Sequence, residues 1–277
     1  MDKYSVVIVL FNPDSEFVQK NVNTLINNKQ IDRVLLIDNS KSNLGDFNDI
    51  LECKVDYLKL DKNFGIAEAQ NRGIANLLKD DINGIFFFDQ DSLISKDFIT
   101  KMIMSDNEIS SKQNNVGIIT PSIVEQYSTI EFESTNYHRV NETISSGSLI
   151  KKDVFLKVGV MEESLFIDYV DFEFCWRVTA NNYCIFKSNS VELEHKVGQK
   201  IISFFGKKIY VPAPFRYYYV YKNGITLIER NYVPNYWKKR ERILQVLTPL
   251  IVIFLLDKKI ERLSYIWKGI TDGYKNK

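Results

Sequence analysis

The sequence is poor in the residues that build zinc sites and disulfide frameworks. It contains three cysteines (Cys53, Cys175 and Cys184) and only two histidines, His138 and His195. An odd number of cysteines without C-x-x-C spacing predicts neither a disulfide framework nor a zinc knuckle. Two histidines are also too few for a His-rich zinc site.

The sequence has neither a large net charge nor an apparent export signal. The 36 basic residues are balanced by 35 acidic ones, so no general attraction to nucleic acid is expected. The first apolar run, Ser5 to Phe11, is followed at once by Asn12-Pro13 and is too short for a signal peptide. We therefore expect a reduced, cytosolic chain.

The common phosphate-binding and hydrolase motifs are missing as well. There is no G-x-x-x-x-G-K-[ST], no H-E-x-x-H and no G-x-S-x-G. The first strand-to-helix turn, Phe11-Asn12-Pro13-Asp14, contains no glycine, which excludes a dinucleotide-binding glycine-rich turn. Any nucleotide must therefore be bound by other groups.

Short apolar runs alternate with amphipathic segments through the first 120 residues. Strands are predicted over 6–11, 34–37, 55–60 and 85–88, and helices over 15–28 and 65–79. This alternation predicts an α/β fold with a doubly wound, mostly parallel sheet flanked by helices. Beyond residue 116 we expect strands at 118–119 and 144–150, a helix over 169–180, a pair of short strands within 183–195, and a C-terminal helical extension.

A polar residue follows each of the first four strands. These residues are Asn12, Asp38, Asp61 and Asp89, and the carboxyl ends of parallel strands form the crevice where such sheets bind ligands. Asp89 and Asp91 form an Asp-x-Asp pair directly after an apolar strand. Carboxylate oxygens suit Mg²⁺ or Mn²⁺ that also binds phosphate, although a capped turn would look the same.

An ordered set of segments then resembles one enzyme family. The segments are 7–13 (VIVLFNP), 36–40 (LIDNS), 63–67 (NFGIA) with Asn71, 87–92 (FFDQDS), 146–150 (SGSLI) and 163–177. Together, over about residues 4 to 230, they resemble the family 2 nucleotide-sugar glycosyltransferases of the GT-A fold. Within that family they are most similar to bacterial rhamnosyltransferases.

The resemblance implies a nucleotide site at the sheet edge. Asp38 would accept a hydrogen bond from the imide N–H of the base, and Asp89 and Asp91, assisted by His195, would hold a Mn²⁺ or Mg²⁺ ion on the diphosphate. His195 could equally be a hydrogen-bonded residue at a strand end. The full implied nucleotide set is Phe11, Asn12, Asp38, Asn63, Gly65, Asn71, Asp89 and Gln90.

The resemblance also implies a catalytic base in the first turn of a helix. Where the family usually has an acidic pair, this sequence reads Val170-Asp171, which leaves Asp171 as the candidate. A capping carboxylate is the simpler alternative, and Asp168 and Glu173 are weaker candidates. Gly147, Ser148 and Asp168 are expected near the donor sugar or the acceptor.

The implied reaction is metal-dependent, inverting transfer of L-rhamnose from dTDP-β-L-rhamnose to a lipid-linked glycan of a bacterial cell wall, capsule or O-antigen. Two alternatives stay open: a UDP-sugar donor (galactofuranose, galactose or glucose), or a non-catalytic nucleotide-binding scaffold. The expected organisation is a catalytic domain over 1–231, with a nucleotide-binding half (1–115) and an acceptor-side half (116–231), and a helical tail over 232–277.

The tail contains an apolar stretch, 243–256, flanked by basic residues and by tyrosine and tryptophan. It is too short for a standard transmembrane helix, and its composition is typical of a helix lying on an anionic membrane. A buried helix or a homodimer interface is the alternative. We therefore expect the protein in the cytoplasm, at the inner face of the cell membrane.

Overall fold

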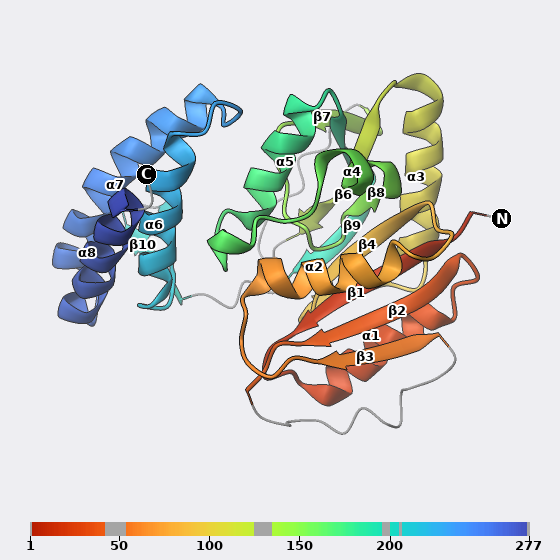
Figure 1. Ribbon diagram of the computed structural model, residues 1–277, viewed down its shortest axis with the longest axis horizontal. Coiled ribbons are helices and arrows are strands. Elements are labelled where there is room, and N and C mark those ends of the chain that lie inside the picture. The colour runs from red at the N-terminus through yellow and green to blue at the C-terminus, as the bar shows by residue number, and fades with distance from the viewer. Residues whose placement is uncertain (1, 42–53, 125–134, 196–199, 205–206, 276–277) are drawn as a thin grey trace.

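A computed structural model of the chain describes residues 2–41, 54–124, 135–195, 200–204 and 207–275. A central sheet is flanked by helices, and a group of helices follows at the C-terminal end (Figure 1). The strands are β1 (Tyr4–Leu10), β2 (Ile31–Asp38), β3 (Val55–Lys59), β4 (Gly84–Asp89), β5 (Ser92–Leu93), β6 (Val116–Val124), β7 (Tyr137–Val140), β8 (Leu149–Lys151), β9 (Cys184–His195), β10 (Lys200–Phe204) and β11 (Lys207–Val211). The helices are α1 (Ser15–Ile26), α2 (Ile66–Leu77), α3 (Phe98–Lys112), α4 (Lys152–Val158), the 3-10 turn η2 (Glu163–Leu165), α5 (Val170–Ala180), α6 (Arg216–Ile228), α7 (Asn235–Leu255) and α8 (Lys259–Lys275).

The first half of the sheet is parallel, in the order β3-β2-β1-β4. Alternate residues of β1 enter two different cores. Val7 packs with α2, α4 and α5 on one face of the sheet, while Val6 and Ile8 pack with α1 and α3 on the other. Because both faces are covered, β1 and β4 read as nearly continuous apolar runs, whereas edge strand β3 alternates between buried or half-buried and exposed residues.

The second half of the sheet is mixed. Strand β8 is antiparallel to both β4 and β6, whereas β6 and β9 are parallel. Two sequence-based expectations were wrong here. Residues 184–195 form one long strand, β9, because it pairs in turn with β7, β6 and β5. Of residues 144–150, only the last two belong to a strand, since Ser148 and its neighbours form a turn beside β4.

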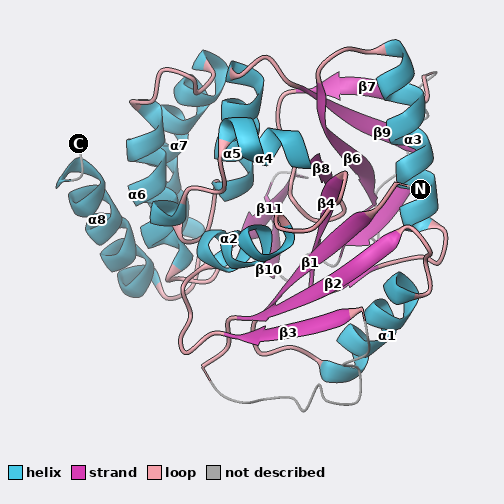
Figure 2. Ribbon diagram, turned by 45° about the vertical axis from the view of Figure 1, so that its right-hand side comes forward, coloured by secondary structure: helices cyan, strands magenta, loops and turns pink. Residues whose placement is uncertain are grey.

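The C-terminal helices form a separate layer. Helix α6 packs closely on α8, and a small core joins α6, α7 and α8 through Tyr217, Tyr221, Val252, Leu256 and Ile266. Figures 1 and 2 show α6, α7 and α8 together on the side of the molecule away from β3. Among the described residues, no helix combines the length and the apolar composition needed to cross a membrane.

Candidate active site

The carboxyl ends of β1, β2 and β4 meet at one edge of the sheet. In the parallel register Leu10 lies beside Asp38, and Val9 lies beside Asp89. The turn after β1 therefore sits between the two aspartates. The backbone pairing thus places three of the four polar strand ends together. Such an edge is where open α/β sheets bind ligands.

Asp38 is buried and its carboxylate is already hydrogen-bonded. Its Oδ2 accepts hydrogen bonds from the Tyr57 hydroxyl at 2.6 Å and from Lys59 Nζ at 2.7 Å, and its Oδ1 accepts one from Ser40 N–H at 2.9 Å. Burial would raise the pKa of Asp38, but the hydrogen bonds from Lys59, Ser40 and Tyr57 lower it below its usual value. Asp38 is therefore a fixed anion at the floor of this edge.

The turn after β1 is held by side chains from the segment that follows β2 and from the Asp-x-Asp segment. Gln90 accepts a hydrogen bond from Phe11 N–H at 2.7 Å and donates one to the Phe11 carbonyl at 3.0 Å. Asn12 adopts a positive φ of 48° and donates its N–H to Ser40 Oγ at 2.7 Å. Gln90 therefore fixes the backbone of Phe11, a residue that is 44% exposed at this edge of the sheet.

A network of asparagines shapes the loop before α2. Asn39 donates to Asn63 Oδ1 at 2.9 Å and to the Gly65 carbonyl at 3.1 Å, and Asn63 Oδ1 also accepts the Gly65 N–H. Asn71 instead ties α2 to the chain before η2: it donates to the Met161 carbonyl at 2.9 Å and accepts the Met161 N–H at 2.9 Å. A nucleotide contact for Asn71 stays a prediction.

Asp89 and Asp91 carry charge that no described cation neutralises. Burial, together with the negative charges of Asp171 and Asp91, raises the pKa of Asp89 to about 7. Crowded carboxylates of this kind fit a divalent cation with oxygen ligands. Within the side chains that the structure describes, no group of three or more metal-binding residues occurs.

The backbone of His195 lies close to this pair. His195 is the last residue of β9, and it pairs with Ser92 of β5, the residue that follows Asp91. The ladder between β5 and β9 therefore brings a histidine that is distant in sequence beside the Asp-x-Asp segment. Its metal role stays a prediction.

The 145–148 turn runs alongside the end of β4. Ser146 Oγ lies 3.1 Å from Asp89 N, which donates to it, and 2.7 Å from Ser92 Oγ. Gly147 has a φ of 78°, and a Cβ there would stand 2.7 Å from Leu193 Cδ2. Glycine is therefore required by backbone conformation and by packing under the turn.

Ser148 is part of the same turn and is buried. Its hydroxyl donates to the Ile144 carbonyl at 2.8 Å, and it lies 3.1 Å from Thr120 Oγ1. The hydroxyl thus holds the turn closed. Sugar contacts for Gly147 and Ser148 stay predictions.

Asp171 lies in the first turn of α5 and faces this turn. Its Oδ2 accepts a hydrogen bond from Ser145 N–H at 3.1 Å. Burial raises the pKa of Asp171, hydrogen bonds from the Ser145 backbone and hydroxyl lower it, and the charge of Asp168 raises it, with a raised value as the net result. A carboxylate with a raised pKa is suited to accept a proton.

Gln70 of α2 supports Ser145 from the other side. Its Nε2 donates to Ser145 Oγ at 3.0 Å, and the side chain is buried. Because Ser145 Oγ accepts this bond, its own proton is free to point toward Asp171. Gln70 was missed from the sequence, since a glutamine in a helix gives no signal of which distant residue it will meet.

The other two acidic residues near α5 hold arginines. Asp168 pairs with Arg216 of α6 at 2.5 Å, and Glu173 pairs with Arg177 at 2.6 Å. Glu173 is fully buried and also accepts from the Tyr232 hydroxyl at 2.8 Å. Among the described residues, Asp171 is thus the acid of this trio without a cationic partner. A sugar contact for Asp168 stays a prediction.

The loop that leads into α5 is strained and is held by α6. Phe166, Asp168 and Tyr169 all have positive φ values, between 63° and 66°, which non-glycine residues adopt only when the surroundings impose them. Asn223 Nδ2 donates to the carbonyls of Leu165, Ile167 and Asp168 at 2.9–3.1 Å. Sequence reasoning missed Arg216 and Asn223, because their partners lie far away in the chain.

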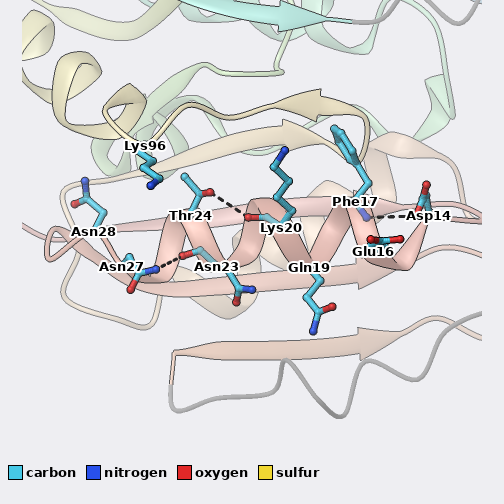
Figure 3. Close-up of a pocket in the computed structure, with 10 residues that line it drawn as sticks. All are labelled: Asp14, Glu16, Phe17, Gln19, Lys20, Asn23, Thr24, Asn27, Asn28 and Lys96. Atoms are coloured by element: carbon cyan, nitrogen blue, oxygen red, sulfur yellow. Dashed lines mark hydrogen bonds between the residues drawn. The ribbon is translucent and has the colours of Figure 1, made fainter.

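A depression elsewhere on the molecule does not involve these residues. An open hollow of about 960 Å³ lies along α1 and is lined by mostly polar residues of the helix and its two ends, together with Phe17 and Lys96 (Figure 3). None of the predicted site residues lines it. We therefore place the candidate active site at the sheet edge and the first turn of α5.

Solved structures of similar shape define the fold class. S. aureus TarS matches with a TM-score of 0.60 and 14% identity, covering 99% of this chain, which spans 49% of TarS. GalNAc-T7, solved with UDP, GalNAc and Mn²⁺, matches with a TM-score of 0.61 and 14% identity, over 99% of this chain and 56% of that one. The protein has the GT-A glycosyltransferase fold.

Sequence comparison then defines the family. The family model "Glycosyl transferase family 2" matches residues 5–143. The dTDP-rhamnosyl transferase RfbF of Shigella flexneri is 32% identical over 292 residues, covering 96% of this chain and 94% of that protein. The chain belongs to glycosyl transferase family 2 and is a rhamnosyltransferase-like glycosyltransferase, which confirms the resemblance, the fold class and the enzyme class predicted from sequence.

Proposed function

We propose that the protein transfers L-rhamnose from dTDP-β-L-rhamnose to a glycan acceptor, with inversion at the anomeric carbon and with Mn²⁺ or Mg²⁺ bound at Asp89 and Asp91. The proposal depends mainly on the proximity of Asp89 and Asp171. The two carboxylates are close enough that the negative charge of Asp171 raises the pKa of Asp89. One carboxylate would hold the diphosphate through a metal, and the other would face the acceptor. The similarity to a dTDP-rhamnosyl transferase supports the choice of donor.

The residues of the crevice divide the work of the reaction. Phe11 and Asp38 would bind the base, with Asp38 held ionised by Lys59, and the Asn63 and Gly65 loop would shape the wall beside it. A divalent ion at Asp89 and Asp91 would neutralise charge that develops on the departing diphosphate. His195, next to this pair through the β5–β9 ladder, would add a ligand or a hydrogen bond.

Asp171 would act on the acceptor. As the acceptor hydroxyl oxygen forms its bond to the anomeric carbon, its proton moves to the Asp171 carboxylate, and the bond between that carbon and the diphosphate oxygen breaks on the opposite face. Ser145 orients the carboxylate through its N–H, and Gln70 orients the Ser145 hydroxyl. Gly147, Ser148 and Asp168 would line the sugar side of the same space.

The acceptor is proposed to be lipid-linked, as in cell-wall, capsule or O-antigen synthesis, so the protein would work in the cytoplasm at the inner face of the membrane. The catalytic unit would comprise residues 1–231. Two alternatives are distinguishable: a UDP-sugar donor on the same site, or a scaffold that binds nucleotide without transfer.

A donor panel tests the proposal. Purified protein with Mn²⁺ or Mg²⁺ is titrated calorimetrically with dTDP-rhamnose, dTDP, UDP-galactose, UDP-glucose and UDP-galactofuranose. We expect metal-dependent binding with preference for dTDP-rhamnose. Preference for a uridine donor would overturn the rhamnosyl assignment, and binding without any transfer to a rhamnan or lipid-linked acceptor would favour the scaffold.

A further inference from the structure

One face of α7 is apolar and uncovered. Ile243, Val246, Leu247, Leu250 and Phe254 recur at intervals of three and four residues, so they share one side of the helix. Their exposed fractions are 59%, 68%, 46%, 48% and 74%, respectively. We call these five residues the α7 stripe. Contiguous exposed apolar surface of this kind marks a binding surface rather than ordinary surface variation.

The opposite face of α7 is firmly packed, so the exposure of the stripe does not reflect a loose helix. Trp237 is buried, and its ring centroid lies 4.8 Å from that of Trp176 of α5, with the two rings tilted by 59°. Glu241 is buried and accepts a hydrogen bond from the Tyr169 hydroxyl at 3.1 Å. These contacts lie beside the loop that leads to Asp171. The stripe is therefore presented on a rigid support next to the active site.

Basic residues dominate the charge at the N-terminal end of the stripe. Glu241 is the sole acidic residue of α7, and it faces inward. Lys239, Arg240 and Arg242 are exposed at this end, whereas at the other end Lys258 and Lys259 stand beside exposed Asp257 and Glu261. An apolar face with a group of cations at one end is complementary to an anionic lipid surface, where the apolar side chains enter the acyl boundary and the cations meet the headgroups.

Other large apolar and aromatic side chains of α7 and α8 are exposed as well. Tyr236, at the start of α7, is 47% exposed, and Trp267 and Ile260 of α8 are 72% and 86% exposed. Tyrosine and tryptophan prefer the boundary between headgroups and acyl chains. Because only one face of α7 is apolar and the apolar stretch is too short to span a bilayer, the helix would lie in the plane of the membrane surface.

We propose that the α7 stripe docks the protein on a bilayer rich in anionic lipid, with the helix lying along the membrane surface. The membrane contact rests on the proposed function in one respect, because the protein would bind a lipid-linked acceptor at the same membrane surface. The buried contacts of Trp237 and Glu241 then hold the Asp171 side of the crevice at a fixed height above the bilayer.

Vesicle sedimentation of the full chain tests the surface. Vesicles of phosphatidylglycerol and phosphatidylcholine are compared with vesicles of phosphatidylcholine alone. We expect binding to the anionic vesicles that weakens as salt is raised, and Leu250→Glu should reduce it at least about tenfold, since a charge at this depth opposes insertion. Leu156→Glu, at a 69% exposed leucine of α4, is the matched control and should bind as the unaltered protein does.

Two measurements separate the possible failures. Circular dichroism establishes that both variants are folded, and calorimetric titration with dTDP establishes that each still binds the nucleotide. Equal vesicle binding by Leu250→Glu and the unaltered protein would overturn the proposal. The proposal would also be overturned if the unaltered protein did not bind vesicles but formed a dimer, measured by light scattering, that Leu250→Glu dissociates. Vesicle binding without dTDP binding would support the surface while contradicting the proposed function.

Discussion

The two sides of the crevice are built by different kinds of interaction. On the nucleotide side, Asp38 and Asp89 are positioned by strands β2 and β4, which both pair in parallel with β1 in a register that has no shift from Ser5 onward. On the base side, Asp171 follows a strained loop. Arg216 and Asn223 of α6, which are distant from this loop in sequence, hold it through direct contacts. The first arrangement follows from local strand pattern, whereas the second exists only once the C-terminal helices have packed.

This difference teaches which parts of the protein tolerate change. Strand-end groups are supported by a backbone ladder that survives the loss of one side chain. The base depends on individual hydrogen bonds to buried groups, and an unsatisfied buried group costs about 1–3 kcal/mol. We therefore expect changes on the base side to alter the rate of transfer, and changes on the nucleotide side to alter binding.

Asp171→Asn gives the largest expected effect on the rate. Removing the carboxylate that accepts the proton should lower kcat by about 10²–10⁴-fold, with folding unchanged. Asp153→Asn is the matched control, because Asp153 also lies in the first turn of a helix, α4, where it accepts from the Tyr183 hydroxyl. Transfer assays on both variants check this. Near-normal turnover by Asp171→Asn would mean that another group is the base.

Gly65→Ala tests a close contact between the nucleotide side and the base side. Gly65 has a φ of 88°, and a Cβ there would stand 2.5 Å from the Phe166 carbonyl oxygen on the base side. We expect a loss of about 2–4 kcal/mol in the free energy of unfolding, measured by urea denaturation.

Gly159→Ala separates the two causes of that loss. Gly159 has a similar φ of 91°, but a Cβ there meets only Arg177 Nη1 at 3.8 Å. This variant should lose only about 1 kcal/mol, the cost of the backbone conformation alone. Equal losses in the two variants would show that the contact with Phe166 is unimportant.

Asp89→Asn should stabilise the metal-free protein at alkaline pH. The pKa of Asp89 is about 7 in the folded protein and about 3.9 in an unfolded chain. The contribution of Asp89 to the free energy of unfolding is therefore fully present below the unfolded pKa and is lost as the pH rises through about 7. With chelator present, we expect the variant to exceed the unaltered protein by about 1–3 kcal/mol at pH 8.

The same comparison at low pH provides the control for Asp89→Asn. At pH 4, where Asp89 of the folded protein is protonated, the advantage should nearly vanish. Thermal unfolding at the two pH values measures both differences. An advantage that is the same at both would show that charge repulsion at Asp89 is absent.

Ser145→Ala should have the smallest effect. The Ser145 hydroxyl lowers the pKa of Asp171, so its removal should raise that pKa and move the acidic limb of the kcat profile to higher pH. At neutral pH kcat should fall by no more than about tenfold, the value of one hydrogen bond. Gln70→Leu should move the limb in the same direction by a smaller amount. An unmoved limb would contradict the link between Ser145 and Asp171.

Much of the nucleotide side could be predicted from the sequence. The runs that became β1, β2 and β4 are largely apolar because helices cover both faces of the sheet there, and a polar residue follows each run. Strand periodicity and the parallel rule then place Asp38 and Asp89 at one edge. The resemblance to family 2 glycosyltransferases added the roles of these residues and selected Asp171.

The base side could not be derived in the same way. Strand β9 was expected as two short strands, since nothing local shows that one strand pairs with three partners. The salt bridge of Asp168 with Arg216 and the bonds of Asn223 join residues from distant parts of the chain. Helix α3 was not singled out either, although Phe98 and Met102 bury one of its faces.

The division of labour between the two sides is tested most directly by donor binding. dTDP is titrated calorimetrically, with and without Mn²⁺, into the unaltered protein, Asp91→Ala and Asp171→Asn, with Asp97→Ala as a control at an exposed carboxylate that pairs with Lys101. We predict that Asp91→Ala loses the Mn²⁺-dependent part of the affinity, whereas Asp171→Asn and Asp97→Ala bind dTDP as the unaltered protein does. Unchanged Mn²⁺-dependent binding by Asp91→Ala, or its loss in Asp171→Asn, would contradict the assignment of metal and base to opposite sides of the crevice.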